Sequence, residues 1–350
     1  MAPPITLLAG DLGGTKTILA IYSWDGIHLI QEHKRLFSSS EWPTLQPMLE
    51  EFLAGVPSNI SPPEFGCVAV AGKVENSSVR VTNLCWDLKE DDLCSIAKLK
   101  RLELVNDFGV LIYGLSSLSI NQQECLQGPI SGIVQEGPIA IIGAGTGLGI
   151  ARGFKNQTEI ISLPSEGGHK EFAPRTKKEW QLSQWLKNEL QLKRLSVERV
   201  VSGTGLGHIA CWLIMENQDQ SHPLKEPAKH WRDKKEKNPD LPAMASKAAD
   251  GGDPLMKEAL KIWLNAYGSA AGDLALHELC TGGLWIGGGT ALKQLKGLKT
   301  DFFLNSFCNK GRFREFLKQL PVIALVDPEA GLFSAACRAR MIAQLNGKLT

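Results

Sequence analysis

The chain has 350 residues, of which 43% are hydrophobic and 21% charged, and its formal net charge is +1 at pH 7. This balance is ordinary for a soluble globular protein and argues against a largely disordered chain. Because the net charge is close to zero, nucleic acid and acidic membranes exert no general attraction, so we expect a small-molecule partner. No basic segment precedes the first apolar residues and no apolar run approaches a membrane span of roughly 20 residues, which favours a cytoplasmic protein.

The length also favours two lobes, because 350 residues are many for one hydrophobic core. The eight cysteines are scattered and form no CxxC pair, so we expect core thiols and neither a zinc site nor a disulfide framework.

The first third of the chain predicts an alternating α/β unit. Three strands are expected over residues 5–11, 17–24 and 27–35, with Asp25-Gly26 forming a type I′ turn between the last two. Apolar residues at helical spacing predict a helix that begins after Thr44 and ends before Gly55. The remaining expected elements are strands over 65–72 and 78–83, a helix near 89–98, a strand from 101, and an apolar helix from Phe108.

The rest of the chain repeats this pattern weakly. Residues 138–154, like residues 5–22, consist of an apolar strand, a glycine-rich turn and a second strand, which suggests two copies of one α/β unit facing each other across a cleft. Later expected elements are helices over 182–195, 253–279 and 328–345, the second with Asp253 as N-cap, and buried strands over 282–289 and 321–327. Residues 216–242 are polar and proline-punctuated, and we interpret them as a surface insertion.

The first glycine-rich turn does not match a Walker A loop, because Thr15 replaces the second glycine and a strand follows in place of a helix. A tight β-turn is the better interpretation, in which the backbone approaches a phosphate and Asp11 holds Mg²⁺ through water. An ordinary glycine-rich hairpin is the alternative. The candidate nucleotide residues are Gly10, Asp11, Leu12, Gly13, Gly14 and Thr15 in this turn, Gly145, Thr146 and Gly147 in the second, and Gly287, Gly288 and Gly289 after a third strand.

Polar residues at loop positions supply the other candidates. Asp107 could simply cap the helix expected from Phe108, but with Asn106 beside it the carboxylate is also a candidate base for phosphoryl transfer. Glu166, His169 and Glu198, together with Asn106, offer the acceptors and donors that suit a ligand with vicinal hydroxyls, such as a sugar. Metal binding by Glu166 and His169 is the competing interpretation, although no thiolate or second histidine stands at ligand spacing.

Six segments in this order resemble a known family: "GDLGGTK", "LVNDF", "GAGTGLG", "EGGHKEFAP", "ERVVSGTGL" and "GGLWIGGG". The resemblance is to the bacterial-type glucokinases of the zinc-free group, and it covers about residues 5–345. It implies an α/β fold with two RNase H-like lobes of the actin and hexokinase type around a central cleft. It also implies ATP-dependent, Mg²⁺-assisted phosphorylation of glucose at the 6-hydroxyl, the entry step of glycolysis, with Asp107 as the base. The sugar ligands that it implies are Asn106, Asp107, Glu166, His169 and Glu198.

The same resemblance implies a small lobe over residues 1–117 plus 331–350, and a large lobe over 118–330 that holds the adenosine and sugar sites. It further implies a homodimer. In this chain Lys73 stands where the family commonly has proline, and residues 166–180 contain no cysteine, unlike the corresponding segment of the zinc-binding relatives.

Four alternatives stay open from sequence. A kinase for another hexose or an N-acetylhexosamine differs only in pocket shape. A donor other than ATP, such as polyphosphate or ADP, is compatible with the same motifs. A sugar-sensing protein of the same fold would bind sugar without turnover, and an actin-like or chaperone ATPase would hydrolyse ATP without sugar.

Overall fold

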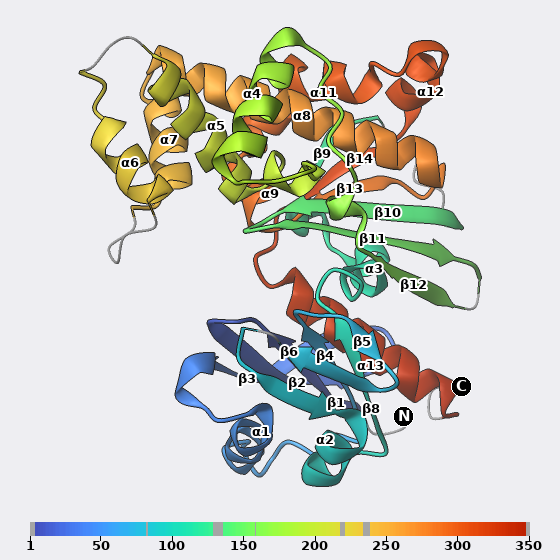
Figure 1. The fold of residues 1–350 in the computed structure, drawn as a ribbon. Coiled ribbons are helices and arrows are strands. Elements are labelled where there is room, and N and C mark those ends of the chain that lie inside the picture. Colours follow the sequence, from blue (N-terminus) through green and yellow to red (C-terminus); the bar gives the residue numbers. More distant parts are fainter. Residues whose placement is uncertain are drawn as a thin grey trace. The chain divides into compact units, whose positions relative to one another are not determined.

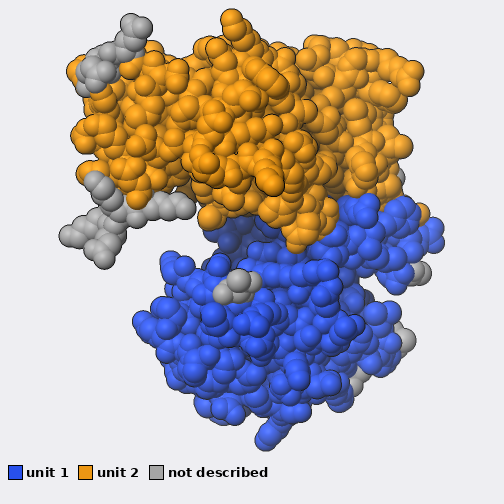
Figure 2. All heavy atoms as spheres, in the orientation of Figure 1, with its two compact units in different colours: residues 1–122, 151–164, 327–350 blue, residues 123–150, 165–326 orange. Residues whose placement is uncertain are grey.

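The structure is a computed structural model that describes residues 4–81, 83–128, 136–157, 159–217, 221–233 and 239–347. The chain divides into two compact units (Figure 2). Unit 1 comprises residues 1–122, 151–164 and 327–350, and unit 2 comprises residues 123–150 and 165–326. These boundaries differ from those of the predicted lobes by a few residues at each crossing, and they add residues 151–164 to the first unit. The division into lobes stays a prediction.

Unit 1 is built on a five-stranded sheet in the order β3-β2-β1-β4-β8 (Figure 1). Strand β1 is antiparallel to β2 and parallel to β4, and β4 is parallel to β8. The strands of this sheet are β1 (Ile5–Leu12), β2 (Lys16–Trp24), β3 (Leu29–Ser38), β4 (Phe65–Val70) and β8 (Arg101–Asn106). A small antiparallel sheet contains β5 (Val74–Glu75), β6 (Ser78–Val81) and β7 (Trp86–Lys89).

The helices of unit 1 bury the sheet's apolar residues. They are α1 (Leu45–Ala54), α2 (Glu90–Ala97), α3 (Leu111–Gly114) and α13 (Ala330–Leu345), with short 3₁₀ turns η1 (Ser39–Glu41), η2 (Leu115–Ser117) and η3 (Ile120–Gln122). Alternate strand residues such as Leu8, Val68 and Leu104 form one core with the apolar faces of α1 and α2. Helix α13 packs against β1 and β4, so the chain returns at its end to the first sheet.

Two local predictions in unit 1 are wrong. The turn after β2 is not a two-residue type I′ turn, because four residues separate Trp24 from its partner Leu29 and only Gly26 has a positive φ, of 102°. The Asp25 carboxylate holds this loop by accepting hydrogen bonds from the amides of Ile27 and His28. The helix expected from Phe108 begins only at Leu111.

Unit 2 contains the second large sheet, in the order β12-β11-β10-β13-β14-β9. Its strands are β9 (Gln123–Gln127), β10 (Gly137–Ala144), β11 (Leu148–Lys155), β12 (Ile160–Ser165), β13 (Leu284–Gly287) and β14 (Val322–Leu325). If the edge strand β9 is left aside and the strands of each sheet are numbered along the chain, both sheets have the strand order 3-2-1-4-5. This shared order confirms the internal duplication that the two glycine-rich segments predicted.

The apolar core of unit 2 is formed by residues of this sheet and of the helices drawn with it in Figure 1. The helices are α4 (Lys177–Glu189), α5 (Gly203–Glu216), α6 (Lys225–Arg232), α7 (Leu241–Asp250), α8 (Pro254–Glu278), α9 (Gly289–Lys293), α10 (Leu295–Leu298), α11 (Asp301–Cys308) and α12 (Arg314–Gln319). Short 3₁₀ turns are η5 (Gly167–His169), η6 (Val197–Arg199) and η7 (Gly311–Phe313). The predicted N-cap of α8 is confirmed, because the Asp253 carboxylate accepts a hydrogen bond from the Met256 amide at 2.9 Å.

The described parts of the segment 216–242, residues 216–217, 221–233 and 239–242, are more than the irregular surface insertion that its composition suggested. They contain α6, whose Ala228 is buried in the core of unit 2 together with Leu224. The Trp231 ring packs edge-on against the ring of His208 in α5, with centroids 5.1 Å apart. Helix α4 in turn ends at Glu189, before the predicted end at residue 195.

Candidate active site

The β1–β2 turn in unit 1 is a tight, braced turn. The Gly13 amide donates to the Lys16 carbonyl at 2.9 Å. Ser39 stabilises the turn with two hydrogen bonds. Its hydroxyl donates to the Gly13 carbonyl at 2.8 Å, and its amide donates to the Thr15 carbonyl at 2.9 Å. Gly14 and Thr15 are exposed, so the tip of the turn is available to a phosphate.

Two other residues predicted for this turn have a packing role in the structure. A Cβ at Gly10 would lie 3.0 Å from a methyl carbon of Val68, so glycine is needed there for the contact between neighbouring strands. The Leu12 side chain is buried in the core of unit 1. Only the main chain of these two residues can face a nucleotide.

The Asp11 carboxyl group lies in an environment that disfavours its ionised form. Burial raises its pKa to about 6, and the charge of Asp107 adds to the effect. The carboxylate also lies against the first turn of α13, where an added Cβ at Gly331 would be only 2.7 Å from Asp11 Oδ2. The Asp107 carboxylate is therefore close enough to disfavour the ionised form of Asp11.

This raised pKa predicts a pH-dependent gain in stability from Asp11→Asn. An acid with a raised folded-state pKa keeps its proton in the folded state after the unfolded chain has lost it, so stability falls as the pH rises from about 4 to 6. At pH 7, without Mg²⁺ or nucleotide, the substitution should raise the free energy of unfolding by about 1–2 kcal/mol, with no gain near pH 4.

Urea unfolding at both pH values measures this effect. Asp25→Asn is the opposite control, because backbone hydrogen bonds from His28 and Ile27 lower the pKa of Asp25. Asp25→Asn should therefore lower the free energy of unfolding at pH 7 and leave it unchanged at pH 3. If Asp11→Asn raised the free energy of unfolding equally at both pH values, the ionised Asp11 carboxylate would not be the source of the instability.

Asn106 and Asp107 form a polar turn where β8 ends. Asn106 Nδ2 donates to the Gly72 carbonyl at 3.0 Å and to Asp107 Oδ1 at 3.1 Å. Its Oδ1 accepts from the amides of Phe108 and Gly109, both at 3.0 Å. The Phe108 amide also reaches Asp107 Oδ1 at 3.0 Å. Neither side chain caps α3, so the alternative role predicted for Asp107 as a helix cap is wrong.

The amide of Asn106 thus uses both of its donors and both acceptor positions within unit 1, and a direct bond to a sugar would require one of them to break. Asn106→Ala should lower the free energy of unfolding by about 2 kcal/mol, because it leaves the Gly72 carbonyl and the Gly109 amide without this partner. Urea unfolding measures the loss. Asn59→Ala, at an exposed turn, is the matched control, and equal small losses for both variants would contradict the account.

Three predicted sugar residues come together in unit 2. His169 Nε2 lies 3.7 Å from Glu166 Oε2, and His169 Nδ1 lies 3.9 Å from Glu198 Oε1. Glu166 and His169 are exposed by 77% and 55%, whereas Glu198 is exposed by only 26%. The cluster is therefore open to a ligand, and Glu198 is its anchored member.

Main-chain hydrogen bonds tie the two loops of this cluster together. The Val197 amide donates to the Lys170 carbonyl at 2.8 Å, and the Phe172 amide donates to the Leu195 carbonyl at 2.8 Å. Arg194 adds a hydrogen bond to the His169 carbonyl at 2.8 Å. Among the described residues, no three His, Cys, Asp or Glu side chains are arranged to hold a metal ion, so metal binding by Glu166 and His169 gains no support.

Glu166, His169 and Glu198 are called the sugar cluster here after their predicted ligand, and Glu198 connects this cluster to the second glycine-rich turn. Its Oε2 accepts a hydrogen bond from the Leu148 amide at 3.0 Å. A Cβ at Gly147 would lie 2.5 Å from the same oxygen, so the close approach requires glycine. The other side of the turn is held by the start of α5, because the Gly203 amide donates to the Gly145 carbonyl at 2.7 Å and Thr204 Oγ1 donates to the Thr146 carbonyl at 3.0 Å.

A cavity of about 730 Å³ opens beside this turn, within unit 2. Of the predicted nucleotide residues, Gly145, Thr146 and Gly289 line it. Gly287 instead belongs to β13, and Gly288 has a φ of 80° and lies against the main chain of Ala144. The volume is in the range of roughly 300–1,000 Å³ that suits a drug-sized ligand.

Most of the cavity wall was missed from sequence. The missed lining residues are Gly203, Thr204, Leu206, Trp231, Asp240, Pro242, Ala243, Ser246, Lys247, Asp250, Thr290, Lys293 and Gln294. The segment "SGTG" at 202–205 carried a usable signal, because a serine N-cap before two glycines marks a helix start that a ligand can approach. Trp231 and the start of α7 lie in the segment interpreted as a surface insertion, and nothing in their pattern indicated a ligand.

The predicted site residues thus fall into two groups. Gly10 to Thr15, Asn106 and Asp107 belong to unit 1, and the glycine turns and sugar cluster described above belong to unit 2. In the part of the chain that the structure describes, no helix is long and apolar enough to cross a membrane.

Comparisons with known proteins identify relatives over nearly the whole chain. The family model described as Glucokinase matches residues 8–342. The glucokinase of Trichormus variabilis is 40% identical over 349 residues, which cover 96% of this chain and 99% of that protein. The crystal structure of a glucokinase from an Antarctic psychrotroph matches with a TM-score of 0.80 and 27% identity, covering 96% of this chain and 98% of that one.

A more distant match supports the fold alone. The ROK family glucokinase of Streptomyces griseus, solved in complex with glucose and AMPPNP, has a TM-score of 0.57 and 20% identity, and the match covers 96% of this chain and 99% of that one.

Proposed function

The chain belongs to the glucokinase family, and from this premise we propose that it transfers the γ-phosphoryl group of ATP to the 6-hydroxyl of D-glucose, as the entry step of glycolysis. The products are glucose 6-phosphate and ADP. The observation that carries the proposal is the sugar cluster Glu166, His169 and Glu198, which is exposed, braced and joined through Glu198 to the second glycine-rich turn.

In the proposed reaction Asp107 is the general base. The O6 oxygen of glucose attacks the γ-phosphorus, the bond from that phosphorus to the β,γ-bridging oxygen breaks, and the hydroxyl proton passes to the Asp107 carboxylate. The hydrogen bonds from Phe108 and Asn106 to Asp107 Oδ1 orient the carboxylate for this transfer. The proposed glucose ligands are Asn106, Asp107, Glu166, His169 and Glu198, and Asn106 would exchange one of its present hydrogen bonds for one to the sugar.

Two features support nucleotide binding, and each is described by itself. The cavity of about 730 Å³ takes the adenosine, and the exposed tip of the β1–β2 turn takes phosphate. Asp11, with the Thr15 hydroxyl beside it, would hold Mg²⁺ through water, because oxygen atoms are the ligands that Mg²⁺ prefers. The ion would neutralise phosphate charge. It would also favour the ionised form of Asp11, which burial and the charge of Asp107 otherwise disfavour. The proposal places the enzyme in the cytoplasm as a homodimer, as the family resemblance implies.

A coupled assay across a panel of hexoses, N-acetylhexosamines and phosphoryl donors tests the proposal. We expect ADP formation that depends on glucose, with ATP as the preferred donor. Sugar binding without turnover would indicate a sugar-sensing protein, and ATP hydrolysis without sugar would indicate an ATPase. Faster turnover of another hexose would correct the substrate while keeping the reaction class.

A further inference from the structure

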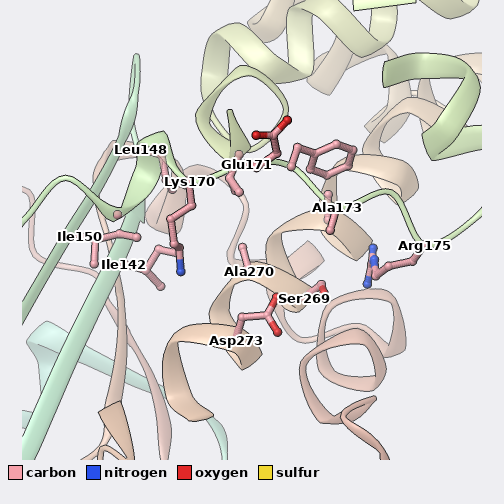
Figure 3. A pocket seen from close by; sticks show the side chains of 14 residues that line it. Ile142, Leu148, Ile150, Lys170, Glu171, Ala173, Arg175, Ser269, Ala270 and Asp273 are labelled. Carbon is pink, nitrogen blue, oxygen red and sulfur yellow. The ribbon is translucent and has the colours of Figure 1, made fainter. Parts of the chain in front are cut away.

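A second cavity, of about 230 Å³, lies in unit 2 between α8 and the segment that follows the sugar cluster (Figure 3). It shares no lining residue with the larger cavity, and none of the proposed glucose ligands lines it. Its apolar wall includes Ile142 of β10 and Leu148 and Ile150 of β11. Its volume is below the range for drug-sized ligands, so it suits a molecule of only a few carbon atoms.

Most charges around this cavity already have partners. Arg175 is paired with Glu179, with Nη2 and Oε1 2.5 Å apart. The Asp273 carboxylate is paired with Lys310 at 2.5 Å, and the same ammonium donates to the Ser269 hydroxyl at 3.0 Å. Because both side chains are already paired, neither Arg175 nor Asp273 should attract a charged ligand strongly.

Lys170 is different. Its ammonium makes no ion pair or hydrogen bond with any described residue, and Figure 3 shows Lys170 and Arg175 reaching toward the space over α8 from opposite sides. The carboxylate of the neighbouring Glu171 is directed away from the other labelled side chains. The cavity therefore combines an apolar wall with one cation that lacks an anionic partner.

We propose that this cavity is a second ligand site that binds a small monocarboxylate, with the carboxylate at Lys170 and a short apolar chain against Ile142, Leu148 and Ile150. The Lys170 ammonium, on the cavity side from which the Glu171 carboxylate is directed away, matches one negative charge, and the apolar wall gains from burying hydrocarbon. Inorganic phosphate could pair with the Lys170 ammonium, but it has no hydrocarbon to pack against the apolar wall.

Such a ligand would contact the loops that carry the sugar cluster. Gly167 and Val197 line the cavity and directly adjoin Glu166 and Glu198 in sequence, and Lys170 adjoins His169. The hydrogen bond from the Val197 amide to the Lys170 carbonyl joins the two loops beside the cavity. Occupancy should therefore change the KM for glucose, a consequence that rests on the proposed function of the cluster.

Binding is tested on the full chain by isothermal titration with butanoate and pyruvate, with butanamide and inorganic phosphate as comparisons. We expect both carboxylates to bind and butanamide to bind far more weakly. Lys170→Gln, at an exposed position, should weaken carboxylate binding by about tenfold or more. Ala270→Leu, which adds bulk to the cavity wall on α8, should do the same, whereas Lys177→Gln, an exposed lysine outside the cavity, should change nothing.

Three results would overturn the site: no carboxylate binding at millimolar concentrations, binding that both cavity variants retain, or phosphate binding as tightly as butanoate. Glucose kinetics with and without butanoate form the second arm, in which an unchanged KM would remove the link to the sugar cluster. Carboxylate binding that depends on Lys170 in a protein without kinase activity would keep the site and remove the proposed function.

Discussion

Replacing Asp107 with asparagine should lower kcat by roughly 10²- to 10⁴-fold and leave the KM for glucose little changed, because the amide cannot accept the proton of the attacking hydroxyl. The asparagine oxygen can still accept the hydrogen bonds from Phe108 and Asn106 that orient the native side chain. The expected loss is therefore chemical and not structural.

Steady-state kinetics with glucose and ATP measure this effect, and thermal unfolding checks that the variant is folded. Asp87→Asn, on the exposed side of the edge strand β7, is the matched control and should keep full turnover. Turnover near that of the native enzyme in Asp107→Asn would remove Asp107 as the base and leave positioning as its only role.

The second large effect concerns Gly147. In Gly147→Ala the new Cβ would lie 2.5 Å from Glu198 Oε2, so the carboxylate must move and lose its hydrogen bond from the Leu148 amide. A hydrogen bond to a charged group contributes about 1.5–3 kcal/mol, so the KM for glucose should rise about 10- to 100-fold. Because Glu198 also adjoins His169, the whole sugar cluster would be disturbed.

Gly145→Ala is a closely matched control for this prediction. It lies in the same turn, but an added Cβ there meets nothing within 4 Å. Its KM for glucose should stay near the native value, even if the KM for ATP changes at the adjacent cavity. The double variant Gly147→Ala with Glu198→Gln should be no worse than Glu198→Gln alone, because both act on one interaction. Equal effects of the two alanine variants on the KM for glucose would contradict the account.

The fold was predictable where periodicity and spacing act locally. The strand, glycine turn and strand pattern at 5–22 and 138–154 predicted two related units, and their sheets have the same strand order. The turn at Asp25-Gly26 was not predictable from the dipeptide, because a carboxylate that accepts two backbone amides stabilises a longer loop. The helix expected from Phe108 begins at Leu111, after a turn in which the Asn106 and Asp107 side chains accept hydrogen bonds from the Phe108 and Gly109 amides, and the apolar pattern alone does not distinguish this turn from a helix.

The candidate site was predictable only in part, for a similar reason. Short motifs identified the residues with polar or glycine character, such as Glu166, His169 and Gly147. They did not identify the wall of the larger cavity, where Trp231 and Pro242 come from a polar segment whose burial depends on contacts with α5. They also could not separate Gly10, a packing glycine, from Gly14 at the exposed tip of the same turn. Those distinctions depend on tertiary neighbours.

The most direct test of the central claim uses glucose labelled with oxygen-18 at O6, incubated with the enzyme, ATP and Mg²⁺ and followed by phosphorus NMR. We expect a sugar phosphate whose phosphorus signal carries the isotope shift of a directly bonded oxygen-18, with one ADP formed for each product molecule. An unshifted sugar phosphate signal, or ADP released as inorganic phosphate accumulates, would contradict transfer to the 6-hydroxyl.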